Sequence, residues 1–196
     1  MRRITTYTDR LHRIVFTAKL KRPYRKLRFY KYGRKSIIYK PNWIIGADRI
    51  SIGDSVLILH GVWLSVEQPA RGAEPPVISI GNHVGLRPYC TISAAEKIVI
   101  EENVILSAFT TVIDSDHTFA AGVPNVMHNP LVTSPVRIGA GTWIGERVSV
   151  LRGSDIGKCC IIGANSVVRG QIPDYSIAVG APARVVGSTK DSFPDA

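Results

Sequence analysis

The residues best suited to chemistry gather around His117, in the run Asp114-Ser115-Asp116-His117. Near neutral pH, histidine accepts a proton from a hydroxyl and returns it without a large change in its pKa. A carboxylate from Asp114 or Asp116 can fix the ring tautomer that this task requires. The spacing therefore predicts a general base at His117, although a histidine that only caps a turn can have the same local sequence.

The three cysteines do not indicate a nucleophile or a disulfide framework. Cys159 and Cys160 are neighbours that cannot easily bridge, and Cys90 stands alone. We expect reduced thiols, with Cys90 and Cys160 in the core. No apolar run approaches the roughly 20 residues of a membrane span, and no signal-peptide pattern follows the basic start. These features predict a cytoplasmic protein.

A six-residue repeat must position these side chains. It opens each block with an aliphatic residue, at Ile138, Ile144, Val150, Ile156, Ile162 and Val168. The fifth place is always compact, at Thr142, Val148, Ser154, Cys160, Ser166 and Ile172. This period fits neither a helix nor a single strand, but it fits a flat side followed by a corner. Three blocks would close a triangular coil of about eighteen residues, which buries its aliphatic residues by stacking on the next coil.

The repeat extends toward the N-terminus and is interrupted at defined places. It begins near Ile44 and is regular from Ile52. Three successive coils break the repeat on the same side, at Gln68, Glu96 and Asp116. This side should therefore form an irregular edge that is open to water. Residues 118–135 lose the repeat completely, so we expect a loop expelled from a corner, where a site would be sought first.

The two ends of the chain differ from the repeat. Residues 1–40 hold fourteen Lys or Arg and one acid, Asp9, with interleaved aromatic residues. A helix is predicted from about Thr8 to Leu20. The basic segment could be a solvated cap on the first coil, or it could contact an anionic membrane surface or glycolipid. Nucleic acid is disfavoured, because no recognised binding module accompanies the charge. From residue 174 the chain should fold back, ending in a frayed tail over 188–196.

Three stretches resemble the hexapeptide-repeat acyltransferases, in particular sugar O-acetyltransferases of the galactoside, maltose and colanic-acid types. They are PVRIGAGTWIG at 135–145, IGANSVV at 162–168 and AVGAPARV at 178–185. The resemblance implies an all-β fold, a left-handed parallel β-helix of about five coils over residues 44–187, behind a basic segment over 1–43. It also implies a homotrimer.

The same resemblance implies a reaction, in which an acetyl group passes directly from acetyl-CoA to a sugar hydroxyl with His117 as general base and without a metal. Five residues match cofactor-binding positions of the family: Trp143, Gly145, Ala164, Arg169 and Arg184. Many relatives have Thr-Lys where Arg169 and Gly170 stand, which leaves the phosphate contact open.

Arg87 marks the acceptor side of the implied site. Galactoside-type relatives have an amide there, and Ala95 replaces an acidic contact. Both differences favour another acceptor, such as a negatively charged sugar in a surface polysaccharide or glycolipid precursor, although a solvated arginine at a corner would have the same local sequence. Other interpretations are an amine acceptor on a nucleotide-linked sugar, a non-catalytic scaffold, and a zinc hydratase using His83, His117 and His128. The last two histidines lie eleven residues apart, farther than in such hydratases.

Overall fold

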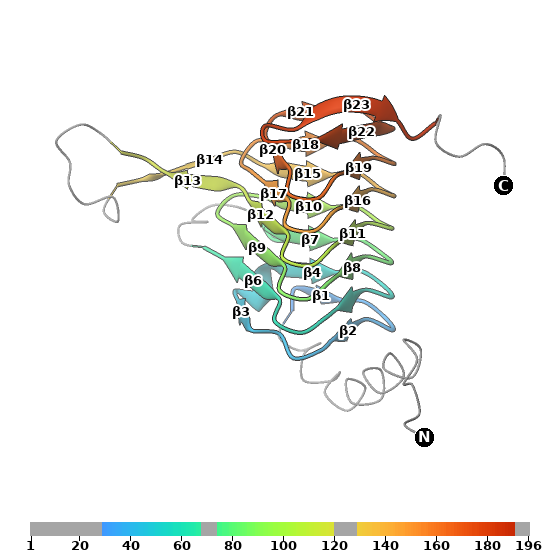
Figure 1. Ribbon diagram of the computed structural model, residues 1–196. Helices are drawn as coiled ribbons and strands as arrows, with labels where there is room; N and C mark the ends of the chain where they lie inside the picture. The colour runs from blue at the N-terminus through green and yellow to red at the C-terminus, as the bar shows by residue number, and fades with distance from the viewer. Residues whose placement is uncertain (1–28, 68–73, 120–128, 191–196) are drawn as a thin grey trace, which may run out of the picture.

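The computed structural model describes residues 29–67, 74–119 and 129–190, which form a triangular prism of stacked coils (Figure 1). Each coil contributes short strands to three sheets, and strands of successive coils pair in parallel. The predicted all-β class and left-handed parallel β-helix are thereby confirmed. No helix in the described ranges is long and apolar enough to cross a bilayer.

The strands are very short, as a repeat with a corner in every block requires. The first sheet contains β1 (Lys31–Tyr32), β4 (Ile50–Ile52), β7 (Ile78–Ile80), β10 (Ile98–Ile100), β15 (Val136–Ile138), β18 (Asp155–Ile156) and β21 (Gln171–Ile172). The second contains β2 (Ile37–Ile38), β5 (Leu57–Ile58), β8 (Gly85–Leu86), β11 (Ile105–Leu106), β16 (Trp143–Ile144), β19 (Ile161–Ile162), β22 (Ser176–Val179) and the antiparallel β23 (Arg184–Ser188). The third contains β3 (Trp43–Ile45), β6 (Trp63–Val66), β9 (Thr91–Ala94), β12 (Thr111–Ile113), β17 (Ser149–Val150) and β20 (Val167–Val168), and a 3-10 turn, η1 (Ala47–Arg49), follows β3.

The core consists of the aliphatic residues that open the blocks. Ile138, for example, pairs with Ile100 on one side and Ile156 on the other, and all three are buried. The compact fifth place includes hydroxyl groups that bond to neighbouring backbone. Thr142 Oγ1 donates to the carbonyl of Gly157 at 2.9 Å, so a buried polar group is satisfied inside the prism.

The corners are tight and use left-handed backbone. Asn103 and Asn165 have φ near 59°, and each donates its backbone N–H to the coil before, at 2.9 and 2.8 Å. A Cβ added to Gly139 would lie 2.5 Å from the carbonyl carbon of Gly157. The absence of a side chain at Gly139 therefore lets two coils touch.

The prism begins earlier than expected. β1 and β2 lie in the segment assigned to a basic N-terminal region, yet they pair in parallel with β4 and β5. The first sheet accordingly has seven strands, more than the five or so coils predicted. The ring of Tyr32 takes an aliphatic place six residues before Ile38 and is only 8% exposed. The repeat was not recognised here because basic residues surround Tyr32 in the sequence. The helix expected over 8–20 lies outside the described residues.

Candidate active site

His117 lies on a β-hairpin that projects from the prism, which we call the arm (Figure 1). The arm consists of β13 (Ser115–His117) and the antiparallel β14 (Leu131–Thr133). His117 is exposed and pairs with Leu131. Beyond it, Thr118 Oγ1 donates to the Pro130 carbonyl at 2.7 Å. The chain therefore leaves the prism before His117, whereas an expelled loop was expected only from residue 118.

Asp114 has a structural task. Its carboxylate is fully buried and accepts the backbone N–H groups of Ala95, Glu96 and Lys97 at 2.7 to 2.8 Å. The edge that was expected to be irregular and wet is thus closed at Asp114, because the carboxylate satisfies three donors of the adjacent coil. These bonds leave the carboxylate committed to the corner and not to His117.

Asp116 anchors the arm. Its Oδ2 lies 2.9 Å from Arg152 Nε and 3.7 Å from an Nη of Arg169, and these arginines follow β17 and β20. Neighbouring residues of a strand point to opposite faces, so Asp116 points away from His117. Within the described ranges, no hydrogen bond joins His117 to Asp114 or Asp116, and the expected orienting contact is not formed within one chain.

Trp143, Gly145 and Ala164 come together on the second sheet and its following corner, and we call this place the ledge. The indole of Trp143 is 51% exposed and donates to Ser107 Oγ at 2.9 Å. A Cβ on Gly145 would lie 2.7 Å from the backbone nitrogen of Ala164. Gly145 is therefore buried against the next coil, and the ledge presents the exposed corner at Ala164 beside one aromatic wall. Sequence reasoning did not predict Ser107 as a partner of Trp143, because its place in the repeat does not indicate a side-chain contact between neighbouring coils.

The three arginines predicted at the site, Arg169 and Arg184 for the cofactor and Arg87 for the acceptor, lie in different places. Arg87 follows β8, and its backbone N–H donates to the Leu106 carbonyl, one coil below Ser107. Arg184 lies on β23, with its guanidinium on the Ala183 carbonyl at 3.0 Å. Arg169 is 3.7 Å from Asp116 at the base of the arm. Arg87 follows a strand of the second sheet, which also holds Trp143 and Arg184, whereas Arg169 follows β20 of the third sheet.

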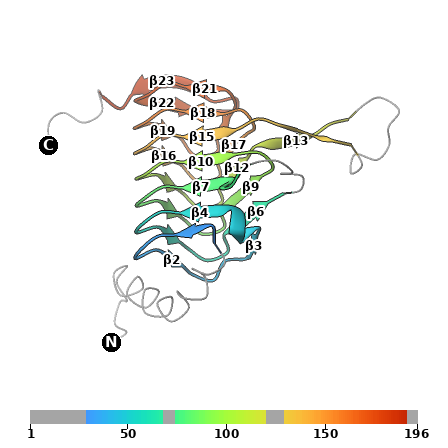
Figure 2. The ribbon, with the colours of Figure 1, turned by 180° about the vertical axis from the view of Figure 1, so that it is seen from behind.

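The arm and the ledge lie on different flanks of the chain. In Figure 1 the arm projects to one side, while β16 and β19 lie toward the other, and the reverse view in Figure 2 agrees. His117 is therefore not brought beside Trp143 within one chain.

Two of the three thiols, those of Cys90 and Cys160, are poor nucleophiles. Cys90 and Cys160 are buried and Cys159 is exposed, all three without a disulfide. Burial raises the pKa of the Cys90 thiol to about 12, and it also raises the pKa of Cys160. The predicted core positions of Cys90 and Cys160 are confirmed.

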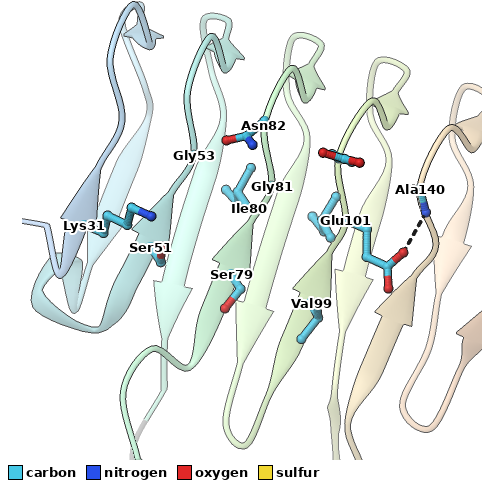
Figure 3. A pocket seen from close by; sticks show the side chains of 12 residues that line it. Lys31, Ser51, Gly53, Ser79, Ile80, Gly81, Asn82, Val99, Glu101 and Ala140 are labelled. Carbon is cyan, nitrogen blue, oxygen red and sulfur yellow. Dashed lines mark hydrogen bonds between the residues drawn. The ribbon is translucent and has the colours of Figure 1, made fainter.

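A shallow groove runs across the outer face of the first sheet, with a volume of about 440 Å³ (Figure 3). Ser51, Ser79 and Val99 form its floor, with Lys31 at one end. At the other end, Glu101 accepts the Ala140 backbone N–H at 2.9 Å. None of the predicted site residues lines this groove.

A zinc site of the hydratase type has no support in the described part of the chain. No three His, Cys, Asp or Glu side chains come together there as metal ligands. His128 lies outside the described residues.

Comparisons with known proteins agree with the repeat. A model described as bacterial transferase hexapeptide (six repeats) matches residues 135–170. A Mycobacterium tuberculosis protein named as an acetyltransferase is 44% identical over 134 residues, covering 68% of this chain and 45% of its own length. This chain thus spans less than half of that relative. WbbJ of Escherichia coli K12, named as a lipopolysaccharide biosynthesis O-acetyl transferase, is 32% identical over 165 residues, which cover 81% of this chain and 80% of WbbJ.

Solved structures share the prism. AntD, an N-acyltransferase from Bacillus cereus in complex with dTDP and 3-hydroxybutyryl-CoA, has a TM-score of 0.68 at 20% identity, covering 86% of this chain and 87% of AntD. A maltose O-acetyltransferase from Clostridium difficile 630 has a TM-score of 0.57 at 24% identity, covering 87% and 75%. These likenesses establish the fold, and the relation to WbbJ extends over most of both sequences. The chain belongs to the hexapeptide-repeat acetyltransferase family.

Proposed function

We propose that this protein is an acetyl-CoA-dependent O-acetyltransferase that modifies a sugar hydroxyl in a cell-surface polysaccharide or glycolipid precursor. The observation that carries the proposal is the match to WbbJ, which extends over most of both chains. The exposed imidazole of His117 supports it, because a group that exchanges protons with an incoming hydroxyl must be accessible.

In this proposal His117 accepts the proton of the acceptor hydroxyl as the oxygen forms its bond to the acyl carbon. Acetyl-CoA supplies the activated acyl group as a thioester. His117 then returns the proton to the departing sulfur. The buried thiols of Cys90 and Cys160 favour direct transfer over a covalent acyl-enzyme.

The ledge suits the slender part of the donor. The exposed corner at Ala164 lies beside the exposed face of Trp143, which offers an apolar wall. Arg184, and Arg169 if it leaves Asp116, would meet the phosphates. On the acceptor side, Arg87 would contact an anionic group of the sugar. Reduced cysteines and an acyl-CoA donor both suit a cytoplasmic reaction.

The test is acetyl transfer from radiolabelled acetyl-CoA to a panel of neutral and acidic cell-envelope glycans. We predict that His117→Ala lowers turnover at least about a hundredfold while thermal unfolding is unchanged. His83→Asn is the matched control, because His83 is an exposed histidine at a left-handed corner where asparagine is well tolerated. Normal turnover by His117→Ala would end the assignment of the general base.

The second candidate is N-acetylation of an amino group on a nucleotide-linked sugar. It is favoured by the shared fold with AntD, whose structure holds dTDP. The product separates the two, because mild alkali cleaves an O-acetyl ester but not an amide. An alkali-stable product in mass spectrometry would replace the hydroxyl acceptor by an amine.

A further inference from the structure

We propose that the N-terminal end of the prism is a docking surface for an anionic lipid bilayer. The surface consists of exposed aromatic and aliphatic residues of the first two coils, together with the cations of the first coil: Tyr30, Lys31, Arg34, Lys35, Lys40, Trp43, Ile45 and Trp63. The inference does not depend on the proposed reaction.

Two of the three tryptophans, Trp43 and Trp63, lie at this end of the third sheet. Trp43 pairs with Trp63 across β3 and β6, and their rings stack with centroids 6.0 Å apart. They are 55% and 38% exposed. In the following coils the strand positions that pair with Trp63 and with one another hold smaller residues, at Thr91, Thr111, Ser149 and Val167. Tryptophan has an apolar body with a polar N–H, which suits the boundary between water and lipid.

Positive charge is concentrated at the same end. The coil over 29–49 carries five Lys or Arg and one acid, Asp48. The coil over 171–190, at the opposite end of the stack, carries two Lys or Arg and one acid, Asp174. Residues 1–28 add ten Lys or Arg to the sequence that precedes the first coil. An anionic leaflet attracts such a cluster close to its surface.

The placement of these groups favours a planar partner. β1, β2 and β3 are the outermost strands of their sheets, at one end of the stack (Figures 1 and 2). Lys31 lies on the first sheet, Arg34 and Lys35 at the next corner, and Lys40 at the corner after that. The cations therefore surround the end of the prism, where a flat surface meets all of them together. A nucleic acid strand would instead be matched by a stripe along one side, and a second copy would bring like charges together.

The test uses the full chain and vesicles of phosphatidylcholine with or without a quarter of phosphatidylglycerol. We expect cosedimentation with the anionic vesicles only, weakened by salt. Trp43→Thr with Trp63→Thr, the residue type found at the paired positions of the next coils, should weaken binding at least about tenfold. Lys158→Glu with Lys190→Glu changes charge near the other end and should leave binding within about twofold. Equal binding to neutral vesicles, binding to neither, or equal binding by the Trp43/Trp63 variant would overturn the proposal.

Fluorescence separates lipid from other partners. In a Trp143→Phe background only Trp43 and Trp63 remain of the three tryptophans. Anionic vesicles should shift their emission to the blue and protect them from acrylamide. Protection in the absence of lipid would show that another copy of the chain covers the pair, and would overturn the inference. Stronger protection by duplex DNA than by vesicles would also overturn it.

Discussion

Asp116 and His117 are neighbours in sequence, but the structure gives them different partners. Asp116 bonds to Arg152, which holds the base of the arm against the next coil. This ion pair is partly exposed, so its contribution to the free energy of unfolding should be at most about 1 kcal/mol. Its effect on the position of His117 can be much larger, because a misplacement of about 1 Å can strongly reduce a reaction rate.

We therefore predict that Asp116→Asn and Arg152→Met each lower kcat about tenfold with little change in Tm. The double variant should be no worse than either single variant, since both remove the same contact. Steady-state kinetics and thermal unfolding of the three variants provide the measurement. Additive losses, or an unchanged kcat in Asp116→Asn, would contradict a shared positioning role.

Cys90 makes stability depend on pH in a predictable direction. Because burial raises the pKa of its thiol from 9.0 to about 12, the unfolded chain releases this proton at lower pH than the folded chain. Stability from the neutral thiol is present below pH 9 and is lost between pH 9 and 12. The advantage of the wild type over Cys90→Ala in free energy of unfolding should thus narrow by about 1.4 kcal/mol from pH 8 to 10. Denaturant unfolding at both pH values checks this, and a constant difference would contradict it.

Residue-level prediction worked where a residue acts through its place in the repeat. The burial of Cys90 and Cys160 follows from such places. Prediction failed for Asp114, because the role of its carboxylate is set by three backbone N–H donors of the preceding coil. Contacts of this kind join distant residues through the stacking of coils, so neither composition nor spacing indicates them.

At the scale of elements, the corners impose the strictest requirement. Gly139 has no space for a Cβ against Gly157, whereas a Cβ on Gly85 would meet only Ile105 at 4.0 Å. We predict that Gly139→Ala lowers the free energy of unfolding by about 2 kcal/mol or more, and that Gly85→Ala changes it by less than about 0.5 kcal/mol. Chemical denaturation of the pair checks this, and equal effects would show that the coils can separate at little cost.

The strands themselves were predictable, because a six-residue period over many blocks leaves few alternatives to a stacked prism. The limits of the prism were not. Tyr32 fills an inward place with an aromatic ring, and the cations around it look like a separate segment. The arm was expected as an irregular loop, since the pairing of β13 with β14 has no alternation of polar and apolar residues that would reveal it.

At the scale of the molecule, the arm with His117 and the ledge with Trp143 face different flanks of one chain (Figures 1 and 2). A single prism also leaves the half-exposed Trp143 in solvent. We therefore propose a homotrimer in which the arm of each subunit reaches the ledge of its neighbour. Light scattering at micromolar concentration should give three times the chain mass of 21.5 kDa.

Such an arrangement makes a stronger prediction for mixed assemblies. His117→Ala subunits lack the base but keep the ledge, while Ala164→Trp subunits keep the base and have an obstructed ledge at an exposed position. Each variant alone should be inactive. If the two are coexpressed and assemble at random in equal amounts, about a quarter of the sites combine an intact base with an intact ledge. Mixed trimers isolated through two different affinity tags exclude the pure assemblies, so about a third of their sites combine both intact parts, and their activity should recover toward that fraction. Mixed assemblies that remain inactive would place both halves of the site in one subunit, and the arm would then have to fold back over its own prism.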